Sequence, residues 1–336
     1  MSRDRVEAGG VVAAARAGDE SAFGALVESY RPELQVHCYR MLGSFEDSED
    51  LVQETFLRAW RKRRSFQGRS TFRAWLYGIA TNACLDALQR RPRIAHPPQG
   101  GQPLTEIPWL QPYPDRLLQG IAPREDEPDA EVVARETIEL TFIAAIQLLP
   151  PKQRVALIAR DVLGWSAVDS ASLLGVSVAA LNSALQRARA TLKQRLPRRR
   201  LDWAAGSDAS AEERALLKRY IDASEHPDPA AMVELLREDA LFAMPPEPEW
   251  WVGGKAIVAS WVDGGGFDPS RFGRFRCVAT RVNMQPAVAN YVRRPGDTEY
   301  RAMLLDVLRV EEGLLAEIVT FPIEPFLGAL GLPQTL

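Results

Sequence analysis

The sequence has few cysteines and histidines and no long hydrophobic run. Its 336 residues include only Cys38, Cys84 and Cys277, together with three histidines. Because these residues match no zinc-ligand spacing, we expect neither a disulfide framework nor a structural metal. No apolar stretch is long enough to span a bilayer, and the N-terminal residues lack the apolar core of a secretory signal. We therefore expect a cytoplasmic protein without a membrane segment.

Charge is unevenly distributed, although the net charge is only −3. Residues 1–96 carry 15 basic and 12 acidic side chains, and residues 150–200 carry 10 basic and 2 acidic ones. By contrast, residues 97–149 carry 3 basic and 9 acidic side chains, and residues 201–336 carry 13 and 21. Basic segments beside acidic ones indicate a nucleic-acid binder that also has a negative surface facing protein.

Composition divides the chain into domains. Residues 92–128 are too rich in proline and glycine for regular structure, although their stretch WLQPYPD contains apolar and aromatic side chains that should pack on a neighbour. A second break falls at residues 196–208. The predicted parts are a helical domain at 1–95, a Pro-rich linker at 96–130, a second helical domain at 131–200 and a third domain at 208–336.

The stretch DSEDLVQETFLRAW, residues 47–60, predicts a helix with two distinct stripes. One stripe is apolar and should face the core: Val52, Phe56, Ala59 and Trp60. The other is mixed acidic and apolar: Asp50, Gln53, Glu54 and Leu57. Taken alone, the second stripe is most simply a solvated helix face. His37 and Cys38, in an earlier helix, are expected to be packing residues.

A basic segment and a glycine-containing loop follow this helix. Basic groups can hold phosphates, and aromatic or amide groups can hold an unstacked base. A cationic helix end with a core tryptophan is the simpler alternative. The candidate DNA-binding residues are Arg61, Arg64, Phe66, Gln67, Arg69, Ser70, Trp75 and Asn82.

DSEDLVQETFLRAW followed by SFQGRSTFRAWLYGIATNACLDAL resembles the promoter-melting domain of extracytoplasmic-function RNA polymerase sigma factors, over most of residues 10–91. The resemblance implies that the mixed stripe docks on the clamp helices of core RNA polymerase. It also implies that the loop at 66–71 and the helix carrying Trp75 and Asn82 receive bases of the opened −10 element. Extracting a base costs a few kcal/mol, which stacking and phosphate contacts of similar size can offset.

Residues 149–196 predict a helix-turn-helix. Gln153 to Asp161 should form one helix, Ser166 or Ser170 should begin the next, and Gly175 should supply the turn. In the last helix the inward residues are Leu181, Leu185 and Ala188. A helical hairpin is the alternative, which the excess of positive charge disfavours. The candidate DNA-binding residues are Ser177 (also the expected cap), Ala179, Asn182, Ser183, Gln186, Arg187 and Lys193.

The segment LGVSVAALNSALQRARATL resembles the −35-binding domain of the same sigma-factor family. Val178 and Leu181 occupy positions where relatives often carry other small or branched residues. The identity of the promoter bases that this helix contacts is therefore left undetermined. Two DNA-binding modules in this order make a generic repressor a poor second choice.

From residue 208 the pattern changes to α+β. Helices are expected at 210–225, 228–236 and 253–262, strands at 239–245, 274–283, 287–294, 299–310 and 314–321, and a short helix at the end of the chain. A curved sheet wrapped on helices makes a cone with a cavity. With MPPEPEWWVGGKAIVASW, this order resembles the SnoaL-like fold, which extends the C-terminus of some sigma factors, including those of the SigG type.

Asp306 is the one candidate acid or base of this domain, since its strand parity could point it into the cavity. No histidine lies near it in sequence, so an enzyme is disfavoured, and Trp250, Trp251 and Trp261 are expected in the core. The loop Asp263 to Pro269 is of a kind that meets partners. We expect a regulatory contact of this domain with the linker or the helical domains, at Trp109, Asp263, Gly264, Gly265 and Phe267.

The sequence thus predicts a multidomain protein: two all-α DNA-binding domains, the second a helix-turn-helix, followed by an α+β SnoaL-like cone. The predicted function is a non-enzymatic sigma subunit that directs core RNA polymerase to promoters and needs no cofactor. Its expected partners are core RNA polymerase and promoter DNA, and an anti-sigma factor is a further candidate. A one-component transcription regulator and a SnoaL-like enzyme fused to DNA-binding helices are the alternatives.

Overall fold

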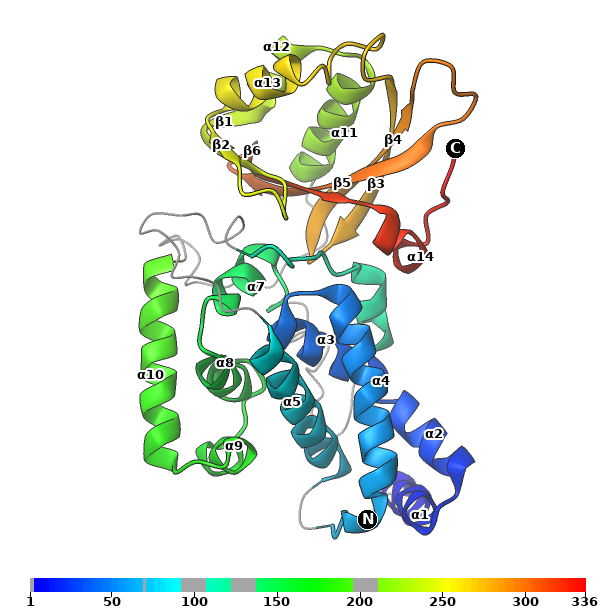
Figure 1. Ribbon diagram of the computed structural model, residues 1–336, viewed down its shortest axis with the longest axis vertical. Coiled ribbons are helices and arrows are strands. Elements are labelled where there is room, and N and C mark those ends of the chain that lie inside the picture. The colour runs from blue at the N-terminus through cyan, green and yellow to red at the C-terminus, as the bar shows by residue number, and fades with distance from the viewer. Residues whose placement is uncertain (1–2, 69–70, 92–106, 122–136, 196–210) are drawn as a thin grey trace. The chain divides into compact units, whose positions relative to one another are not determined.

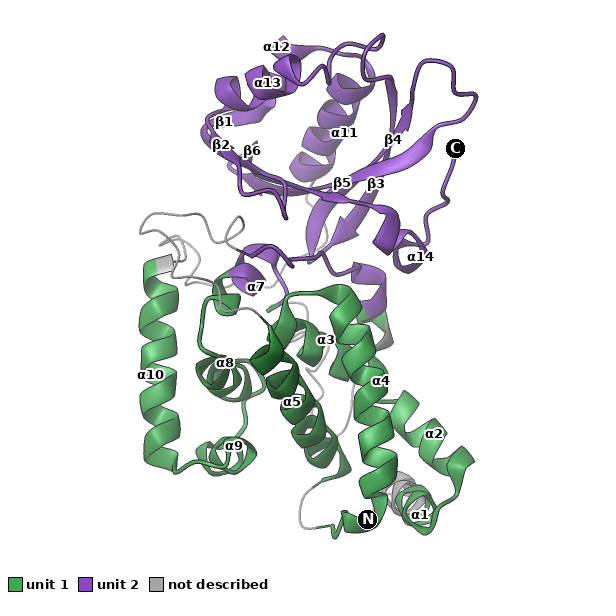
Figure 2. Cartoon of the chain, viewed as in Figure 1, with its two compact units in different colours: residues 1–93, 118–137, 145–201 green, residues 94–117, 138–144, 202–336 purple. Residues whose placement is uncertain are grey.

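The computed structural model describes residues 3–68, 71–91, 107–121, 137–195 and 211–336 (Figure 1). The chain forms two compact units (Figure 2). The helical unit comprises residues 1–93, 118–137 and 145–201, and the cone unit comprises residues 94–117, 138–144 and 202–336. Both sets of helices predicted to bind DNA therefore lie in one unit, whereas residues 107–117 and 138–144 belong with the cone.

The first half of the helical unit is a bundle whose helices begin at side-chain caps. Asp19, Ser44 and Thr71 accept hydrogen bonds from the first turns of α2, α4 and α5. Gly43 ends α3 in a left-handed conformation, with φ 69°. The elements are α1 (Arg3–Ala17), α2 (Glu20–Glu28), α3 (Arg31–Leu42), α4 (Phe45–Lys62), the short η1 (Arg63–Ser65) and α5 (Phe72–Arg90).

Helix α3 lies in the middle of this bundle, and its polar side chains are buried with partners. Arg73 Nε donates to Glu33 Oε2 over 2.7 Å, and the hydroxyl of Tyr77 lies 3.2 Å from the same oxygen. His37 Nε2 lies 2.9 Å from Thr81 Oγ1. His37 and Cys38 are both buried, so their predicted role in packing is confirmed.

The second half of the helical unit contains the helix-turn-helix. Its first helix is shorter than predicted, because α8 ends at Leu157 and continues as a π-helical turn, η3 (Ile158–Val162). Of the two serines considered, Ser166 caps α9, and Gly175 ends α9 with φ 62°. The elements are α7 (Leu140–Gln147), which begins in the cone unit, α8 (Pro151–Leu157), η3, α9 (Ala167–Leu174) and α10 (Val178–Arg195).

Buried Arg154 joins the two halves of the helical unit. Its guanidinium donates to the carbonyl oxygens of Met41, Gln147 and Leu149 and to the Gln147 side chain. Burial lowers the pKa of Arg154 to about 9. Because several acceptors share this one cation, α8 is held against the end of α3.

The cone consists of a six-stranded sheet curved around helices. The strand order is β2-β1-β6-β5-β4-β3, antiparallel except for the parallel pair β1 and β6. The elements are α11 (Ala211–Glu225), α12 (Pro229–Leu235), β1 (Leu236–Ala243), β2 (Trp250–Val252), α13 (Gly254–Asp263), β3 (Arg274–Val282), β4 (Gln285–Arg293), β5 (Arg301–Glu311), β6 (Leu314–Pro322), η5 (Glu324–Phe326) and α14 (Leu327–Leu330).

The predicted core role of the three tryptophans needs correction. Trp250 lies on the short edge strand β2, which the sequence pattern did not predict, and its side chain is 40% exposed. Trp251 and Trp261 pack on the core cluster and also line a cavity. The reason is that the sheet curves away from the helices and leaves space that these rings border without filling.

Among the described residues, no single helix has the length and hydrophobicity needed to cross a membrane. Helices α9 and α10 meet that test only as a pair, and they are bent by 93° at the turn of the helix-turn-helix.

Candidate functional site

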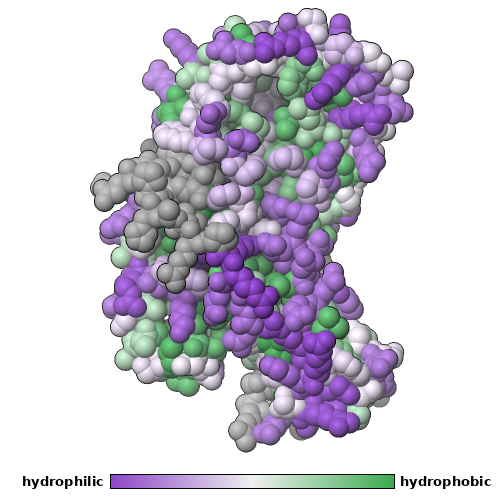
Figure 3. All heavy atoms as spheres, viewed as in Figure 1, coloured by the Kyte–Doolittle hydropathy of each residue, from purple (hydrophilic) through white to green (hydrophobic). Residues whose placement is uncertain are grey.

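The mixed stripe of α4 is exposed as the sequence pattern predicted. Asp50 and Gln53 are exposed, and the Leu57 side chain is 53% exposed. Glu54 is half-buried, because it accepts a hydrogen bond from Arg58 over 2.7 Å. The surface over α4 is largely hydrophilic (Figure 3), so Leu57 places an apolar side chain in a polar, acidic neighbourhood.

The opposite stripe of α4 anchors the helix. Val52, Phe56 and Ala59 are buried, and the half-buried ring of Trp60 lies 5.0 Å from that of Phe23. Because the core packs against this stripe only, the mixed stripe is not required for packing of the bundle.

The basic end of α4 combines one fixed arginine with free-standing ones. The Arg63 guanidinium stacks 3.8 Å above the Trp60 ring and donates to the Trp60 carbonyl oxygen. Arg61, Lys62 and Arg64 are exposed. Their positive charges therefore project into solvent, where they can contact a polyanion.

The loop after α4 contains an aromatic cluster. The Phe66 ring lies 5.5 Å from Phe72 and 5.4 Å from Trp75. Phe66 is only 7% exposed, so in this conformation its ring supports the half-buried Trp75 and is not offered to a base. Gln67 and Asn82 are exposed as predicted, whereas Arg69 and Ser70 lie outside the described residues.

The exposed face of α10 carries most of the predicted contact residues of the helix-turn-helix, while Leu181, Leu185 and Ala188 are buried. Ser177 Oγ accepts a hydrogen bond from the Ala180 amide, so it caps the helix. The Ser183 hydroxyl donates to the Ala179 carbonyl oxygen. All seven predicted positions are exposed: Ser177, Ala179, Asn182, Ser183, Gln186, Arg187 and Lys193.

The sequence pattern missed one fixed arginine in this face. Arg189 forms a two-pronged ion pair with Asp161, at 2.6 and 2.8 Å. Asp161 and Arg189 are 28 residues apart in the sequence, so no local sequence pattern indicated that they form an ion pair. The pair fixes Arg189, so Arg187 and Lys193 are the better candidates for phosphate contacts.

A further site joins the linker to the cone, at the turn between β3 and β4. Asn283 donates its amide to the Tyr113 carbonyl oxygen over 2.9 Å, and its Oδ1 accepts from the Tyr113 amide over 2.7 Å. The Met284 amide donates to Asp115 Oδ1, and Pro114 pairs with Val282 as an isolated β-bridge. The linker was predicted to meet the cone near Trp109, and these contacts lie four to six residues farther along.

The same asparagine also holds the segment that leads into α7. Asn283 Nδ2 donates to the Ile138 carbonyl oxygen over 2.6 Å, and Gln285 Oε1 accepts from the Leu140 amide over 3.1 Å. Asn283 is fully buried and adopts a positive φ of 52°, which asparagine tolerates better than most residues. A linker residue and the segment that leads into α7 therefore meet at one turn.

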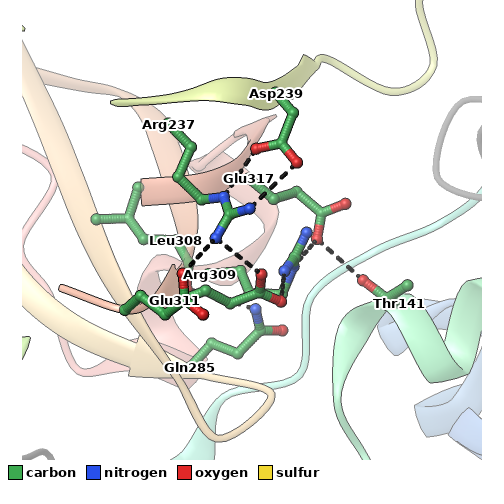
Figure 4. A network of polar contacts seen from close by, with 9 residues as sticks. Thr141, Arg237, Asp239, Gln285, Leu308, Arg309, Glu311 and Glu317 are labelled. Atoms are coloured by element: carbon green, nitrogen blue, oxygen red, sulfur yellow. Dashed lines mark hydrogen bonds and ion pairs between the residues drawn. The ribbon is translucent and has the colours of Figure 1, made fainter. Parts of the chain in front are cut away.

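A polar network extends this attachment across the sheet (Figure 4). Glu317 Oε2 accepts from the Thr141 hydroxyl over 3.0 Å and from Arg309 Nε over 2.9 Å. Arg309 also contacts Glu311, which lies 3.7 Å from Arg237. The first turn of α7 is thus tied to charged side chains of three strands.

The predicted contact loop of the cone borders the cavity. Gly264, Gly266 and Phe267 are among the lining residues. Gly265 has φ 84°, and a Cβ there would lie 2.6 Å from the Arg271 side chain. The Asp263 carbonyl oxygen accepts from the same arginine. The loop therefore has a defined conformation that substitution would disturb.

Comparisons with known proteins cover nearly the whole chain. Residues 26–94 match Sigma-70 region 2, residues 140–192 match Sigma-70 region 4, and residues 217–318 match the SnoaL-like domain. The ECF RNA polymerase sigma factor SigG of Mycobacterium tuberculosis is 40% identical, over 96% of this chain and 86% of its own length. The sigma factor SigW of Bacillus subtilis is 29% identical over 53% of this chain and 91% of its own.

Among solved structures, the extracytoplasmic function sigma factor SigJ of Mycobacterium tuberculosis has a similar fold. Its TM-score is 0.57 at 22% identity, over 92% of this chain and 99% of that one. The SigG similarity spans both helical regions and the SnoaL-like domain. The chain therefore belongs to the extracytoplasmic-function RNA polymerase sigma factors, in the group that carries a C-terminal SnoaL-like domain.

Proposed function

We propose that this sigma factor docks on core RNA polymerase through the mixed stripe of α4 and contacts promoter DNA through the basic loop and α10. In this proposal Asp50, Gln53, Glu54 and Leu57 face the polymerase. Arg61, Arg64, Gln67, Arg69, Ser70, Trp75 and Asn82 serve the −10 element, with Phe66 as the support of Trp75. The exposed face of α10 serves the −35 element, and the chain acts in the cytoplasm.

One observation supports the docking assignment: Asp50, Gln53 and Leu57 are exposed, whereas Val52, Phe56 and Ala59 of the opposite stripe are buried. An exposed leucine flanked by carboxylate and amide groups suits a protein surface that combines a hydrophobic contact with a basic rim. The neighbouring Arg61 and Arg64 have the opposite charge and suit phosphate. The two ends of α4 thus serve different partners.

The test is promoter-directed transcription by purified chain with core RNA polymerase, on a library of genomic promoter fragments. We expect specific transcripts only when both proteins are present. Sequence-specific duplex binding by the chain alone, with no transcripts, would favour a one-component regulator. Turnover of a small molecule by the chain, with no transcripts, would favour an enzyme fused to DNA-binding helices.

We further propose that the cone regulates the sigma factor by holding the linker. The support is the Asn283 turn, where one buried side chain bonds Tyr113 and Ile138, on either side of residues 114–137. Each such hydrogen bond contributes about 1 kcal/mol net, so several together hold the linker firmly yet reversibly. The cone can therefore limit how far the two DNA-binding halves separate.

The variant Asn283→Gly tests this proposal, because glycine keeps the positive φ while removing both side-chain bonds. Thr298→Ala, in the exposed β4–β5 turn, is the matched control. We expect faster hydrogen exchange at the Tyr113 amide and a severalfold change in promoter-directed transcription for Asn283→Gly alone. Faster exchange with parental transcription would leave the contact structural and refute the regulatory role.

A further inference from the structure

The cone contains a cavity of about 310 Å³ that the proposed sigma function does not use. Residues of α11, α12, α13 and all six strands line it, and its size is that of a small-molecule site. Most of the wall is apolar, with Met232, Met244 and Leu304 beside the rings. The aromatic lining residues, apart from Tyr220, are Phe242, Trp251, Trp261, Phe267, Phe272 and Phe275.

Asp306 forms the polar end of this cavity. Its Oδ1 accepts a hydrogen bond from Thr320 over 2.6 Å, and its Oδ2 accepts from Tyr220 over 3.0 Å and from Asn290 over 2.5 Å. All three donors are uncharged. Burial raises the pKa of Asp306, and the three hydrogen bonds oppose that shift by stabilising the carboxylate. A carboxylate offers about four acceptor sites, so one site on Oδ1 is left for a further donor.

The other polar groups of the wall present acceptors to the cavity. The hydroxyl groups of Tyr220 and Thr320 donate hydrogen bonds to Asp306. Ser224 donates to the Tyr220 carbonyl oxygen and Ser260 to the Ile257 carbonyl oxygen. Each hydroxyl oxygen keeps lone pairs but has no hydrogen left to donate.

The glycine loop cannot serve as an anion site either. The amides of Gly264, Gly265 and Gly266 donate to carbonyl oxygens of α13 over 2.9 to 3.0 Å. The remaining side-chain donors of the wall are the uncharged indole groups of Trp251 and Trp261. Among the described lining residues, Asp306 is the only aspartate, glutamate, lysine, arginine or histidine. The cavity therefore combines a carboxylate, hydroxyl acceptors and π faces, which all attract positive charge.

We propose that this cavity binds a lipophilic amine in its protonated form, with the ammonium group at Asp306 and the apolar body against the aromatic wall. The ammonium supplies the donor that Oδ1 can still accept and the positive charge that a buried carboxylate otherwise lacks. Aromatic faces add attraction for the cation, and an anionic ligand would meet the carboxylate without any cationic side chain to offset it.

Calorimetric titration of the full chain with three compounds of one skeleton tests the proposal: naphthylethylamine, naphthylethanol and naphthylacetate. We expect the amine to bind about tenfold more tightly than the alcohol, which corresponds to about 1.4 kcal/mol, and the acetate to bind most weakly. Equal binding of amine and acetate, or no binding of the amine at millimolar concentration, would overturn the proposal.

Asp306→Asn should weaken amine binding about tenfold and alcohol binding much less, because it removes the charge and nearly preserves the shape. Asp297→Asn is the control, since it makes the same chemical change in the exposed β4–β5 turn. Unchanged amine binding by folded Asp306→Asn would make Asp306 a structural hydrogen-bond hub and refute its role. If that variant does not fold, as circular dichroism would reveal, the three-compound series on the parent chain decides. Neither measurement involves polymerase, so the outcomes of both are independent of the proposed sigma function.

Discussion

At the residue scale, the helical unit contains an uncharged histidine among buried polar side chains. Burial, helped by the nearby cations Arg40 and Arg73, lowers the pKa of His37 to about 3. The ring centroid lies 4.9 Å from that of Tyr77, and Nε2 is hydrogen-bonded to Thr81, so the ring is packed among buried side chains that favour its neutral form. His37 is therefore a pH-sensitive part of the structure.

We predict that acidification destabilises the chain through His37. Between pH 6.5 and about 3 the unfolded state binds a proton at His37 that the folded state does not. The unfolding free energy should thus fall as pH falls, by about 1.4 kcal/mol per pH unit from this residue. Denaturant titrations at several pH values give the unfolding free energy at each pH. This free energy should depend less steeply on pH for His37→Gln than for the parent. The exposed His226→Gln serves as control, and an unaltered slope in His37→Gln would contradict the assignment.

At the scale of single elements, α4 and α10 each have one buried and one exposed side. Within the described part of the chain, no hydrogen bond or ion pair holds the Asp50 and Leu57 side chains of α4, whereas Glu54 is paired with Arg58. In α10 the Arg189 pair with Asp161 fixes one cation. Substitutions can therefore be chosen that change a surface and leave internal contacts intact.

For α4 we predict that Asp50→Arg with Leu57→Arg weakens binding to core RNA polymerase at least about tenfold. Thermal stability should change little, since exposed substitutions usually alter the unfolding free energy by no more than about 0.5 kcal/mol. Affinity measurements with purified core should include Glu249→Arg, an exposed charge reversal in the cone, as control. Equal affinity of the double variant and the parent would disprove the docking assignment.

For α10 we predict different effects of two exposed residues on −35 DNA. Asn182→Ala should relax preference at one base position, at a cost of about 1 to 3 kcal/mol. Arg187→Ala should weaken binding to all sequences and flatten the salt dependence, because it removes a phosphate contact. Selection of DNA sites at two salt concentrations separates these outcomes. Identical base preferences for the Asn182 variant and the parent would exclude it from base reading.

At the scale of the whole molecule, the cone and the helix-turn-helix carry opposite charge. Residues 201–336 have an excess of 8 acidic side chains, and residues 150–200 have an excess of 8 basic ones. The shared chain keeps their effective concentration high, so even weak attraction can matter. The bonds of Asn283 to both sides of residues 114–137 are a specific contact that lies within the cone unit.

We predict that ending the chain after Ala205 changes promoter-directed transcription severalfold, in whichever direction the cone acts. Removing the cone also uncovers Tyr113, Ile138 and Leu140, which are fully buried in the intact chain, so the truncated protein should be more prone to aggregate. Gly265→Ala should reproduce part of the transcriptional effect if the loop takes part. Parental transcription by a soluble truncated chain at every salt concentration would show that the cone is a separate module.

Much of the helical architecture followed from local sequence. Ser166 was a recognisable cap and Gly175 a recognisable turn, because capping depends on residues within one helical turn. The inward face of α10 followed from its spacing for the same reason. The motifs resembling sigma regions 2 and 4 were also linear, so the family could be predicted before the fold was known.

Only the tertiary structure decided the contacts between distant residues. Tyr113 and Asn283 are 170 positions apart, and no periodicity relates a linker residue to a hairpin turn. Phe66 was a candidate DNA-binding residue in the sequence, yet packing against Phe72 and Trp75 buries it. Asp306 was found by strand parity, but its three donors come from a helix and two other strands. Its environment depends on how the sheet curves, which is set by the packing of the whole cone.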